Sequence, residues 1–348
     1  MSILVTGGAG FIGSHTCLSL LEKGYNIVVI DSFINSNKLS LERVKDLVSE
    51  KNSIQLNILK GDIRDQNLLN DIFLNYKSKK KPITSVIHFA GLKSVKESVI
   101  NPIKYWDINV NGALTLFSKM KEYECHNIVF SSSATIYGKS NQIRISEKTQ
   151  INPTNPYGQT KAAIEKILYD LFSSKKEPWK IANLRYFNPI GAHESGLIGE
   201  SPLGIPNNIF PFLTKVAQGN LEKLNIFGND WPTKDGTGVR DYIHVMDLAE
   251  GHIAALEFLL SNNKSQIINL NLGTGLGTSV LELVRTFEKV NNVNINYKFV
   301  PRREGDVANV VADNRLAKSI LNWQPRRSLE EMCLDGWNWQ CLNPKGYI

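Results

Sequence analysis

The sequence predicts an α/β fold in which a doubly wound parallel sheet is covered by helices on both faces and is joined to a smaller mixed α/β domain. Two observations predict it. Short apolar runs alternate with segments of helical periodicity, which is typical of parallel sheets. The first of these runs also leads directly into a glycine-rich turn and a helix. At 348 residues, the chain has the length of two domains.

The glycine-rich turn predicts a dinucleotide site in a Rossmann-type domain. The apolar run Ile3–Val5 enters the segment Thr6–Gly13, whose glycines permit a tight turn and a close approach of the backbone to a pyrophosphate. A second buried strand, Ile27–Ile30, ends at Asp31. A carboxylate there accepts hydrogen bonds from the ribose hydroxyls and repels the additional phosphate of NADP, so we expect NAD as the cofactor. The glycines are Gly7, Gly10 and Gly13.

Four later apolar runs predict the rest of the sheet. Ligands in such sheets bind beyond the carboxyl ends of the strands, so the residues that follow each run are candidates for the cofactor site. They include Asp62, Lys93 and Ser133. The predicted strands are Ile54–Leu59, Ser85–Gly91, Asn127–Phe130 and Lys180–Tyr186.

Glycine and proline become frequent from about Asn188, which predicts a second, substrate-binding domain. We therefore expect a cofactor domain over residues 1–185 and a substrate domain over 186–348. The apolar run Ile267–Leu272 reads as a further buried strand, and Thr278 or Ser279 is a candidate cap for the helix that follows. Residues from about 240 to 275 are therefore expected to return in part to the first domain.

Composition favours a small-molecule enzyme. The formal charge of +7 is spread along the chain, so we expect no nucleic-acid partner, although a positive surplus suits a phosphorylated substrate. The four cysteines and six histidines show no metal-ligand spacing, and we expect no metal site. No apolar run reaches the length of a membrane span. We expect a soluble protein of the cytoplasm.

Tyr157 and Lys161 are the candidate catalytic pair. Pro156 is expected to open a helix here, and a spacing of four residues puts both side chains on one face of it. A lysine ammonium near a phenol favours the phenolate and lowers its pKa from a reference value near ~10. The phenolate is then a plausible general base for an alcohol, with Ser133 beside it at the end of a strand.

These segments resemble the extended short-chain dehydrogenase/reductase family and, more narrowly, the UDP-glucose 4-epimerase family. The broader likeness rests on the glycine-rich turn, on Asn109–Gly112, on Ser131–Ser133 and on the pair Tyr157/Lys161. The narrower likeness spans essentially the whole chain. Its blocks are Gly61–Arg64, His88–Lys93, Leu184–Pro189, Gly204–Asn208, Gly236–Val245 and Arg302–Asp306.

The resemblance implies a redox-neutral epimerisation at carbon 4 of a UDP-sugar. Tyr157 would take the proton of the 4-hydroxyl, Lys161 would lower the pKa of Tyr157 and bind the nicotinamide ribose, and Ser133 would hydrogen-bond the reacting oxygen. Hydride would pass to NAD and return on the opposite face of the turned 4-keto sugar. Besides these three residues and the glycines, the implied NAD contacts are Phe11, Ile12, Asp31, Ser32, Phe33, Ile34, Asn35, Ser36, Asp62, Ile63, Phe89, Ala90, Gly91, Leu92, Lys93, Asn109 and Phe187.

The resemblance also implies how the UDP-sugar is held. Arg240 and Arg303 would bind the pyrophosphate, Asp306 the uridine ribose, and the segment 225–227 the uracil. Val310 stands where the family carries either a bulky tyrosine or a small residue, which suggests that the pocket admits UDP-N-acetylglucosamine as well as UDP-glucose. The substrate residues are Lys93, Ser133, Tyr157, Phe187, Asn188, Asn208, Asn225, Ile226, Phe227, Arg240, Arg303, Asp306 and Val310.

Two other functions fit the same fold. A sugar-nucleotide 4,6-dehydratase needs an additional acid and base, which relatives place directly after the hydroxyl residue, whereas this chain has Ala134 and Thr135 after Ser133. A non-catalytic NAD-binding regulatory module would not need the catalytic residues, all of which are present. The resemblance further implies a homodimer that packs helices around residues 101–121 and 157–172, and a place in galactose metabolism.

Overall fold

The computed structural model describes residues 1–140, 142–204, 206, 208–303 and 305–348, and Ile205, Asn207 and Glu304 of the family blocks lie outside the described residues. The chain forms two compact units. The first comprises residues 1–138, 151–185 and 249–270, and the second comprises residues 139–150, 186–248 and 271–348.

Residues 139–150 belong to the second unit, although the sequence led us to expect them in the first. Backbone contacts explain the difference. Ile145 bridges Ala312 and donates its N–H to the Val311 carbonyl at 2.8 Å. Glu147 Oε1 accepts the N–H of Asn271 at 2.8 Å. The segment is therefore pinned to two distant parts of its own unit, which no local pattern reveals.

A seven-stranded sheet forms the centre of the first unit and confirms the predicted fold class. The strand order is β11-β6-β5-β4-β1-β2-β3, and β1 pairs in parallel with both β2 and β4. The third strand begins two residues later than predicted, because Ile54 follows a short helix and is 79% exposed. The strands are β1 Ser2–Thr6, β2 Ile27–Asp31, β3 Leu56–Lys60, β4 Ile83–His88, β5 Asn127–Ser133, β6 Lys180–Tyr186 and β11 Gln266–Leu272.

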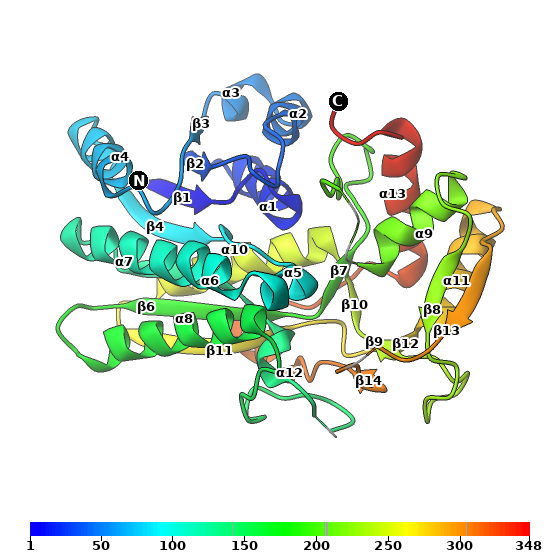
Figure 1. The fold of residues 1–348 in the computed structure, drawn as a ribbon. Helices are drawn as coiled ribbons and strands as arrows, with labels where there is room; N and C mark the ends of the chain where they lie inside the picture. The colour runs from blue at the N-terminus through cyan, green and yellow to red at the C-terminus, as the bar shows by residue number, and fades with distance from the viewer. Residues whose placement is uncertain (141, 205, 207, 304) are drawn as a thin grey trace. The chain divides into compact units, whose positions relative to one another are not determined.

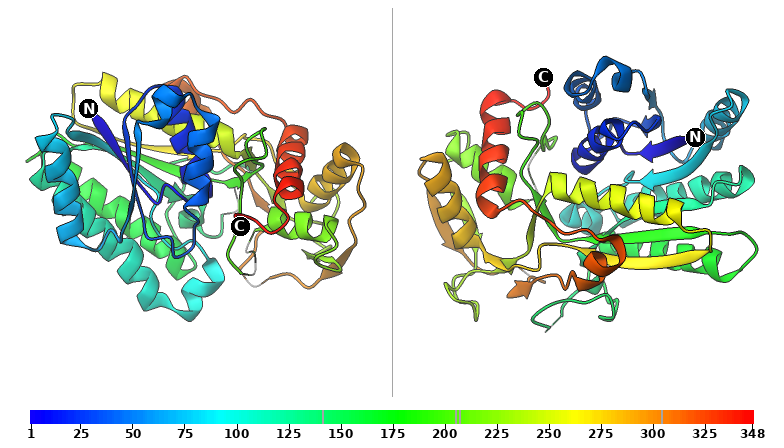
Figure 2. Two further views of the ribbon diagram at one scale, coloured as in Figure 1. Left: turned by 90° about the horizontal axis from the view of Figure 1, so that it is seen from above. Right: turned by 180° about the vertical axis from the view of Figure 1, so that it is seen from behind.

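Helices cover both faces of this sheet (Figures 1 and 2). Helices α1 (Phe11–Glu22) and α10 (Val245–Ser261) lie on one face, and α4 (Gln66–Ser78), α7 (Gly112–Glu122) and α8 (Pro156–Ser173) lie on the other. The strands read as continuous apolar runs because they are buried on both sides. The shorter elements are α2 Leu39–Leu47, α3 Glu50–Ser53, α5 Val95–Ile100, α6 Pro102–Tyr105, the π-helix η1 Trp106–Asn111 and the 3-10 helix η2 Ala134–Tyr137.

The second unit is built from short strand pairs and helices around its own apolar core, which includes Phe210, Leu283 and Phe287. Ser279 caps α11 and forms a capping box with Glu282, which confirms the predicted cap. The elements are β7 Asn188–Ile190, α9 Ile209–Ala217, β8 Leu224–Phe227, β9 Val239–Arg240, β10 Tyr242–His244, β12 Thr278–Ser279, α11 Val280–Asn291, β13 Tyr297–Val300, β14 Asn309–Val310, α12 Arg315–Leu321 and α13 Leu329–Leu342.

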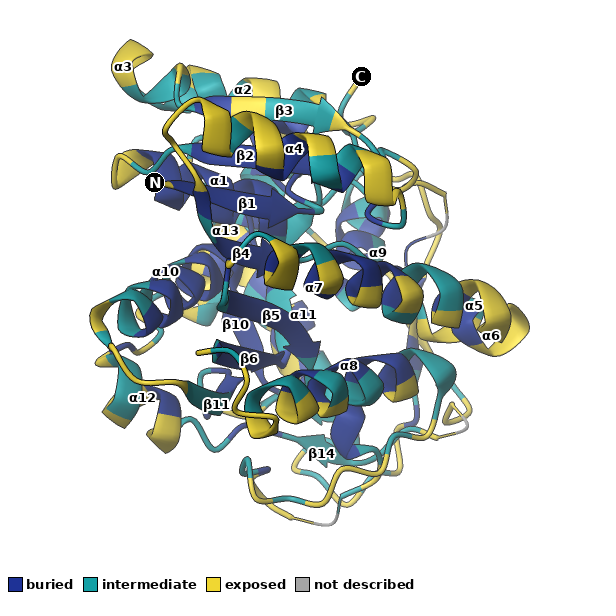
Figure 3. Cartoon of the chain, turned by 90° about the vertical axis from the view of Figure 1, so that its left-hand side faces the viewer, coloured by how far each residue is buried: buried dark blue, intermediate teal, exposed yellow. Residues whose placement is uncertain are grey.

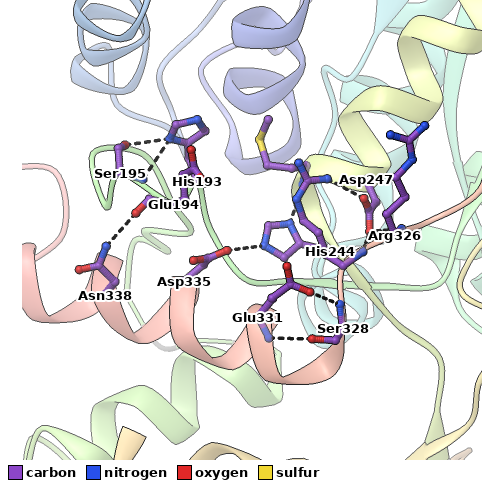
Figure 4. A network of polar contacts seen from close by, with 12 residues as sticks. His193, Glu194, Ser195, His244, Asp247, Arg326, Ser328, Glu331, Asp335 and Asn338 are labelled. Atoms are coloured by element: carbon purple, nitrogen blue, oxygen red, sulfur yellow. Dashed lines mark hydrogen bonds and ion pairs between the residues drawn. The ribbon is translucent and has the colours of Figure 1, made fainter. Parts of the chain in front are cut away.

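A polar network fastens α13 to the end of β10 (Figure 4). His244 Nδ1 accepts the N–H of Met246 at 3.0 Å, so Nε2 carries the hydrogen and donates to Asp335 at 3.1 Å. The buried carboxylate of Asp247 accepts from the Arg327 guanidinium at 2.6 Å and from the N–H of Arg326 at 3.1 Å. These contacts explain how charged groups are accommodated inside the second unit.

Replacing Gly13 by Ala is expected to destabilise the first unit. At an open helix position, Ala would be more favourable than Gly by about 0.5–1 kcal/mol. At Gly13, however, a Cβ atom would lie 2.5 Å from the Gly7 carbonyl oxygen and 2.8 Å from Gly8 Cα. We therefore expect a net loss of about 1–3 kcal/mol in the free energy of unfolding, measured by chemical denaturation.

Gly10→Ser provides the matched control. A Cβ atom there lies 3.4 Å from the same Gly7 oxygen, and serine is a favourable residue at the N-cap position that Gly10 occupies. We expect this variant to stay within ~0.5 kcal/mol of the parent protein. A Gly13→Ala variant that is as stable as the parent would contradict the close packing of the turn.

Candidate active site

The turn between β1 and α1 has the geometry of an anion cradle. Gly7 adopts a φ of +70°, and a Cβ atom on it would lie 2.6 Å from the backbone nitrogen of Ala90, so only glycine fits. Gly10 caps α1 without a side-chain hydrogen bond, which leaves first-turn N–H groups for another acceptor. The turn therefore fits the pyrophosphate of a dinucleotide.

Asp31, at the end of β2, shapes the neighbouring loop. Its Oδ2 atom accepts the N–H of Ala9 at 2.9 Å, and its Oδ1 atom accepts from the N–H of Phe33 at 2.9 Å and from Ser36 Oγ at 2.8 Å. A carboxylate has about four lone-pair sites, so one acceptor site remains for a ribose hydroxyl. Ser32, Ile34 and Asn35 lie in this loop, and Ile34 is exposed.

Asp62 follows β3 and is engaged with a residue that the sequence did not single out. Arg64 donates to Asp62 at 2.6 Å and also pairs with Asp107 of η1. Hydrogen bonds from Arg64 lower the pKa of Asp62 and keep it ionised. Ile63 lies between them with its side chain in the core of the unit, so only its backbone can face a ligand.

Asn109 organises the segment Phe89–Lys93 that follows β4. Its Oδ1 atom accepts the N–H of Leu92 at 2.8 Å, and its Nδ2 atom donates to the Leu92 carbonyl and to Thr160 Oγ1, both at 3.1 Å. The amide is thus used within the protein. Asn109 ties the segment to α8 through its hydrogen bond with Thr160.

The three predicted catalytic residues come together in the first unit. Asn155 caps α8 by accepting the N–H of Gly158 at 2.9 Å, and Pro156 occupies the first turn, as predicted. Lys161 donates from Nζ to the Ser131 carbonyl at 2.6 Å, and its Nζ lies 6.0 Å from the centroid of the Tyr157 ring. Ser133 ends β5 and hydrogen-bonds Tyr157.

The sequence predicted a lowered pKa for Tyr157, and the structure contradicts this prediction. Burial raises this pKa, and the hydrogen bond with Ser133 opposes the rise. Lys161 contacts the Ser131 carbonyl instead of the phenol oxygen, which explains why it does not reverse the effect. Burial also lowers the pKa of Lys161 to about 7, and the charge of Glu165 opposes that change. Lys161 is therefore poised to change its charge near neutral pH.

The second unit brings Arg240, Asp306 and Val310 together. Arg240 lies 3.5 Å from Asp306 and also donates to the carbonyls of Val239 and Val307. Arg240 and Val310 are register partners in the parallel pair β9 and β14, so their side chains lie on the same face of that sheet. This places a residue predicted to set sugar specificity beside one predicted to bind pyrophosphate.

The proposed uracil segment lies on β8. The guanidinium of Arg303 stacks over the Phe227 ring at 3.8 Å, and burial lowers the pKa of Arg303. The strand alternates, so Asn225 is exposed whereas Ile226 points into the core and offers a ligand only its backbone. Elsewhere in this unit, the structure places Phe187 buried, Asn188 at the start of β7, and Asn208 exposed beside Glu200.

Comparisons with known proteins identify the family. The family model for GDP-mannose 4,6 dehydratase matches residues 4–335. A UDP-glucose 4-epimerase of Bacillus subtilis (strain 168) is 51% identical over 347 residues, which cover 100% of this chain and 99% of that protein. The chain belongs to the UDP-glucose 4-epimerase family. This places it among the extended short-chain dehydrogenases/reductases, as the sequence motifs predicted.

Solved structures of the epimerase family agree with the fold. The UDP-glucose 4-epimerase from Bifidobacterium longum, in complex with NAD+ and UDP, has a TM-score of 0.92 and 44% identity, and the match covers 99% of this chain and 100% of that one. The UDP-Glc/GlcNAc 4-epimerase from Campylobacter jejuni has a TM-score of 0.83 and 31% identity, with 98% and 99% covered.

Two charged residues near Ser133, Tyr157 and Lys161 were given no role of their own by the sequence analysis, Glu165 and Arg185. Their signal was present, since each is a charged residue inside an apolar helix stripe or an apolar strand. Among the described residues, no group of three His, Cys, Asp or Glu side chains could hold a metal ion. In the same part of the chain, no helix combines the length and apolarity needed to cross a bilayer.

Proposed function

We propose that the chain interconverts UDP-galactose and UDP-glucose with NAD, by oxidation and re-reduction at carbon 4 of the hexose. The observation that carries this proposal is the meeting of Ser133, Tyr157 and Lys161 in the unit that also contains the glycine cradle. Membership of the epimerase family supports the same activity.

NAD is the cofactor that the first unit fits. A side chain on Gly7 or Gly13 would collide with the backbone that shapes the turn, and Asp31 retains an acceptor site for the ribose. When bound, NAD would supply a reversible hydride acceptor for carbon 4. The remaining contacts are assigned to the loop 32–36 and to the segment 89–93, with Lys161 on the nicotinamide ribose.

Tyr157 moves the proton. As the hydride leaves carbon 4, the phenolate oxygen takes the proton of the 4-hydroxyl, and Ser133 donates a hydrogen bond to the same reacting oxygen. Return of the hydride to the other face requires Tyr157 to give the proton back. Lys161, as the ammonium, stabilises the phenolate before the first of these events and after the second. The cycle leaves the redox state of the cofactor unchanged.

Arg240 and Arg303 hold the nucleotide while the sugar turns. Rotation of the hexose requires that most binding energy fall on groups remote from the reacting ring. Guanidinium groups serve this purpose because they grip phosphate oxygens bidentately. The neighbouring acids Asp241 and Asp247 are engaged elsewhere, on Thr274 and Arg327, so Arg240 is left to pair with Asp306. We assign Asp306 to the uridine ribose.

A 4,6-dehydratase remains a weaker candidate, although the matching family model carries that name. Such an enzyme needs an acid and a base beside the hydroxyl residue. Here Thr135 follows Ser133 by two positions and donates from Oγ1 to Ser133 Oγ at 3.0 Å. The place expected for the carboxylate is thus taken by a hydroxyl, which supports epimerisation over loss of water.

Isotope retention tests the proposed reaction. UDP-galactose deuterated at carbon 4 should yield UDP-glucose that keeps the label, because the hydride returns to the carbon that it left. Mass spectrometry of the product measures this. Tyr157→Phe should lower kcat by roughly two to four orders of magnitude while nucleotide binding persists. Loss of the deuterium to solvent, or full activity in Tyr157→Phe, would refute the mechanism.

Val310 is proposed to admit N-acetylated sugars. Its position opposite Arg240 in the β9–β14 register puts a small side chain on the face that carries the pyrophosphate ligand. A bulky aromatic ring at the same position would occupy the space that an acetamido group needs.

Val310→Tyr is therefore expected to separate the two substrates. The variant should lose activity with UDP-N-acetylglucosamine by at least ~10-fold and keep most activity with UDP-glucose. Steady-state kcat/KM for both sugars measures the ratio, and Val310→Ala is the matched control that should keep both activities. A parent protein that rejects the acetylated sugar by more than about a thousandfold, or ~4 kcal/mol, would refute the assignment.

A homodimer is proposed to form over α5, α6, η1, α7 and α8. Figure 3 shows exposed residues along α5 and α6. Apolar side chains gathered on the outer surface of this unit suit an isologous contact in which each copy presents the same patch. The exposed apolar residues are Val95, Val99, Ile100, Ile103, Trp106, Leu114 and Tyr169.

Free thiols at all four cysteines suit a reducing cytoplasm, which we propose as the location.

Ile103→Glu should disrupt this dimer. Ile103 is 83% exposed on α6, and a charge there would be buried without a partner on association. Light scattering after gel filtration should change from dimer to monomer mass. Ile54→Glu is the control, because Ile54 is 79% exposed but lies outside the proposed patch. A monomeric parent protein, or a dimer unaffected by Ile103→Glu, would contradict the proposal.

A further inference from the structure

A buried ion pair lies beside the proposed catalytic residues. Arg185 of β6 donates to Glu165 of α8 through two nitrogens, Nη2 to Oε2 at 2.6 Å and Nε to Oε1 at 3.0 Å. The side chains are only 3% and 6% exposed. A buried ion pair is usually no more stabilising than apolar residues of the same size, because both ions lose their hydration. Stability alone therefore gives little reason for this pair.

Two neighbouring hydroxyls complete the network. Ser132 Oγ donates to Glu165 Oε1 at 2.6 Å, and Arg185 Nη1 donates to Tyr137 Oη at 2.9 Å. Glu165 is thereby held by contacts from β5 and β6 at once. Its carboxylate cannot turn away from the interior without breaking several buried hydrogen bonds, each of which would leave an unsatisfied polar group.

The network is linked to Lys161 through helix α8 and strand β5. Glu165 follows Lys161 by one helical turn, so both side chains lie on the same face of α8. Three consecutive serines of β5 contact three residues of α8. The Ser131 carbonyl accepts from Lys161, Ser132 donates to Glu165, and Ser133 hydrogen-bonds Tyr157. One displacement of β5 against α8 would change all three contacts.

The groups around Lys161 differ in charge. Its Nζ lies 4.9 Å from the centroid of the Phe130 ring, and beneath that ring His88 stacks at 5.7 Å and stays neutral, since burial lowers its pKa to about 3. Tyr157 lies on the same helix, and burial raises its pKa. Among the described residues, Glu165 is the acid whose charge raises the pKa of Lys161.

We propose that Glu165, fixed by Arg185 and Ser132, is a positioning residue that keeps Lys161 in its ammonium form and holds it at the Ser131 carbonyl. This inference rests on the catalytic role proposed for Lys161. A neutral amine at this position would no longer stabilise the Tyr157 phenolate, so turnover would fail on the alkaline side whenever Lys161 lost its proton. The carboxylate of Glu165 moves that loss to higher pH.

The test is the pH profile of kcat in the variant Glu165→Gln/Arg185→Met. Neutralising both partners avoids leaving either charge buried alone, which single substitution would do. We expect the alkaline limb of the profile to move to lower pH by about one unit, and kcat at neutral pH to fall about tenfold. KM for the UDP-sugar should stay within about twofold, because the nucleotide ligands are elsewhere in the sequence.

Two controls separate charge from packing. Tyr137→Phe removes a hydrogen bond from Arg185 but no charge, and its alkaline limb should stay where the parent has it. Glu165→Asp keeps the charge, whereas Glu165→Asn has the same shape as Asp without the charge. The Asp variant should therefore keep the alkaline limb closer to the parent position than the Asn variant does. This second pair decides the question should the double variant fail to fold. A folded double variant with an unmoved limb, or an equal displacement in Tyr137→Phe, would overturn the proposal.

Lys161→Met distinguishes failure of this inference from failure of the proposed mechanism. If Lys161→Met keeps full turnover, the catalytic assignment is wrong and the role of Glu165 falls with it. If Lys161→Met is inactive while the double variant keeps its alkaline limb, only the role of Glu165 is refuted. Circular dichroism and thermal unfolding of each variant establish that the comparison is made between folded proteins.

Discussion

The first unit depends on the parallel register of its sheet. Because β1, β2, β3, β4 and β5 run in the same direction, their carboxyl ends meet at one edge, and each end carries a residue with a defined polar role. Gly7, Asp31, Asp62 and Ser133 are far apart in sequence but are brought to this edge by strand pairing alone. The helix α8 then adds Tyr157 and Lys161 from the face that packs on β5.

The buried charged groups at this edge are stabilised by hydrogen bonds to other protein groups in place of water. The ammonium of Lys161 is held by a backbone carbonyl and an aromatic face, and the carboxylate of Glu165 by a guanidinium and a hydroxyl. The second unit uses the same solution at Asp241, whose carboxylate accepts N–H groups of Thr274, Gly275 and Ala312. Burial raises the pKa of Asp241, and these bonds oppose the rise.

Sequence patterns predicted the elements that depend on local periodicity and on glycine or proline. The turn at Gly7–Gly13, the start of α8 at Pro156 and the cap at Ser279 are confirmed, because each has a local physical signature. Contacts between distant segments could not be predicted this way. The assignment of residues 139–150, the pairing of Arg64 with Asp62 and Asp107, and the Glu165–Arg185 pair all depend on tertiary packing. The pKa of Tyr157 also depends on tertiary packing, because burial raises it whereas the spacing from Lys161 predicted a lowered value.

The proposed chemistry explains why the proton-transfer residues belong to the first unit and the nucleotide-binding arginines to the second. Proton transfer needs fixed geometry and low solvation, and Ser133, Tyr157 and Lys161 are all held within a helix and a strand of the first unit. Nucleotide binding needs strong contacts that persist while the sugar turns, and Arg240 and Arg303 belong to the second unit. A sugar that rotates about its bond to a fixed pyrophosphate can present both faces of carbon 4 to one hydride carrier. The general base then needs no second copy, because the reacting oxygen returns to the same phenol in either orientation.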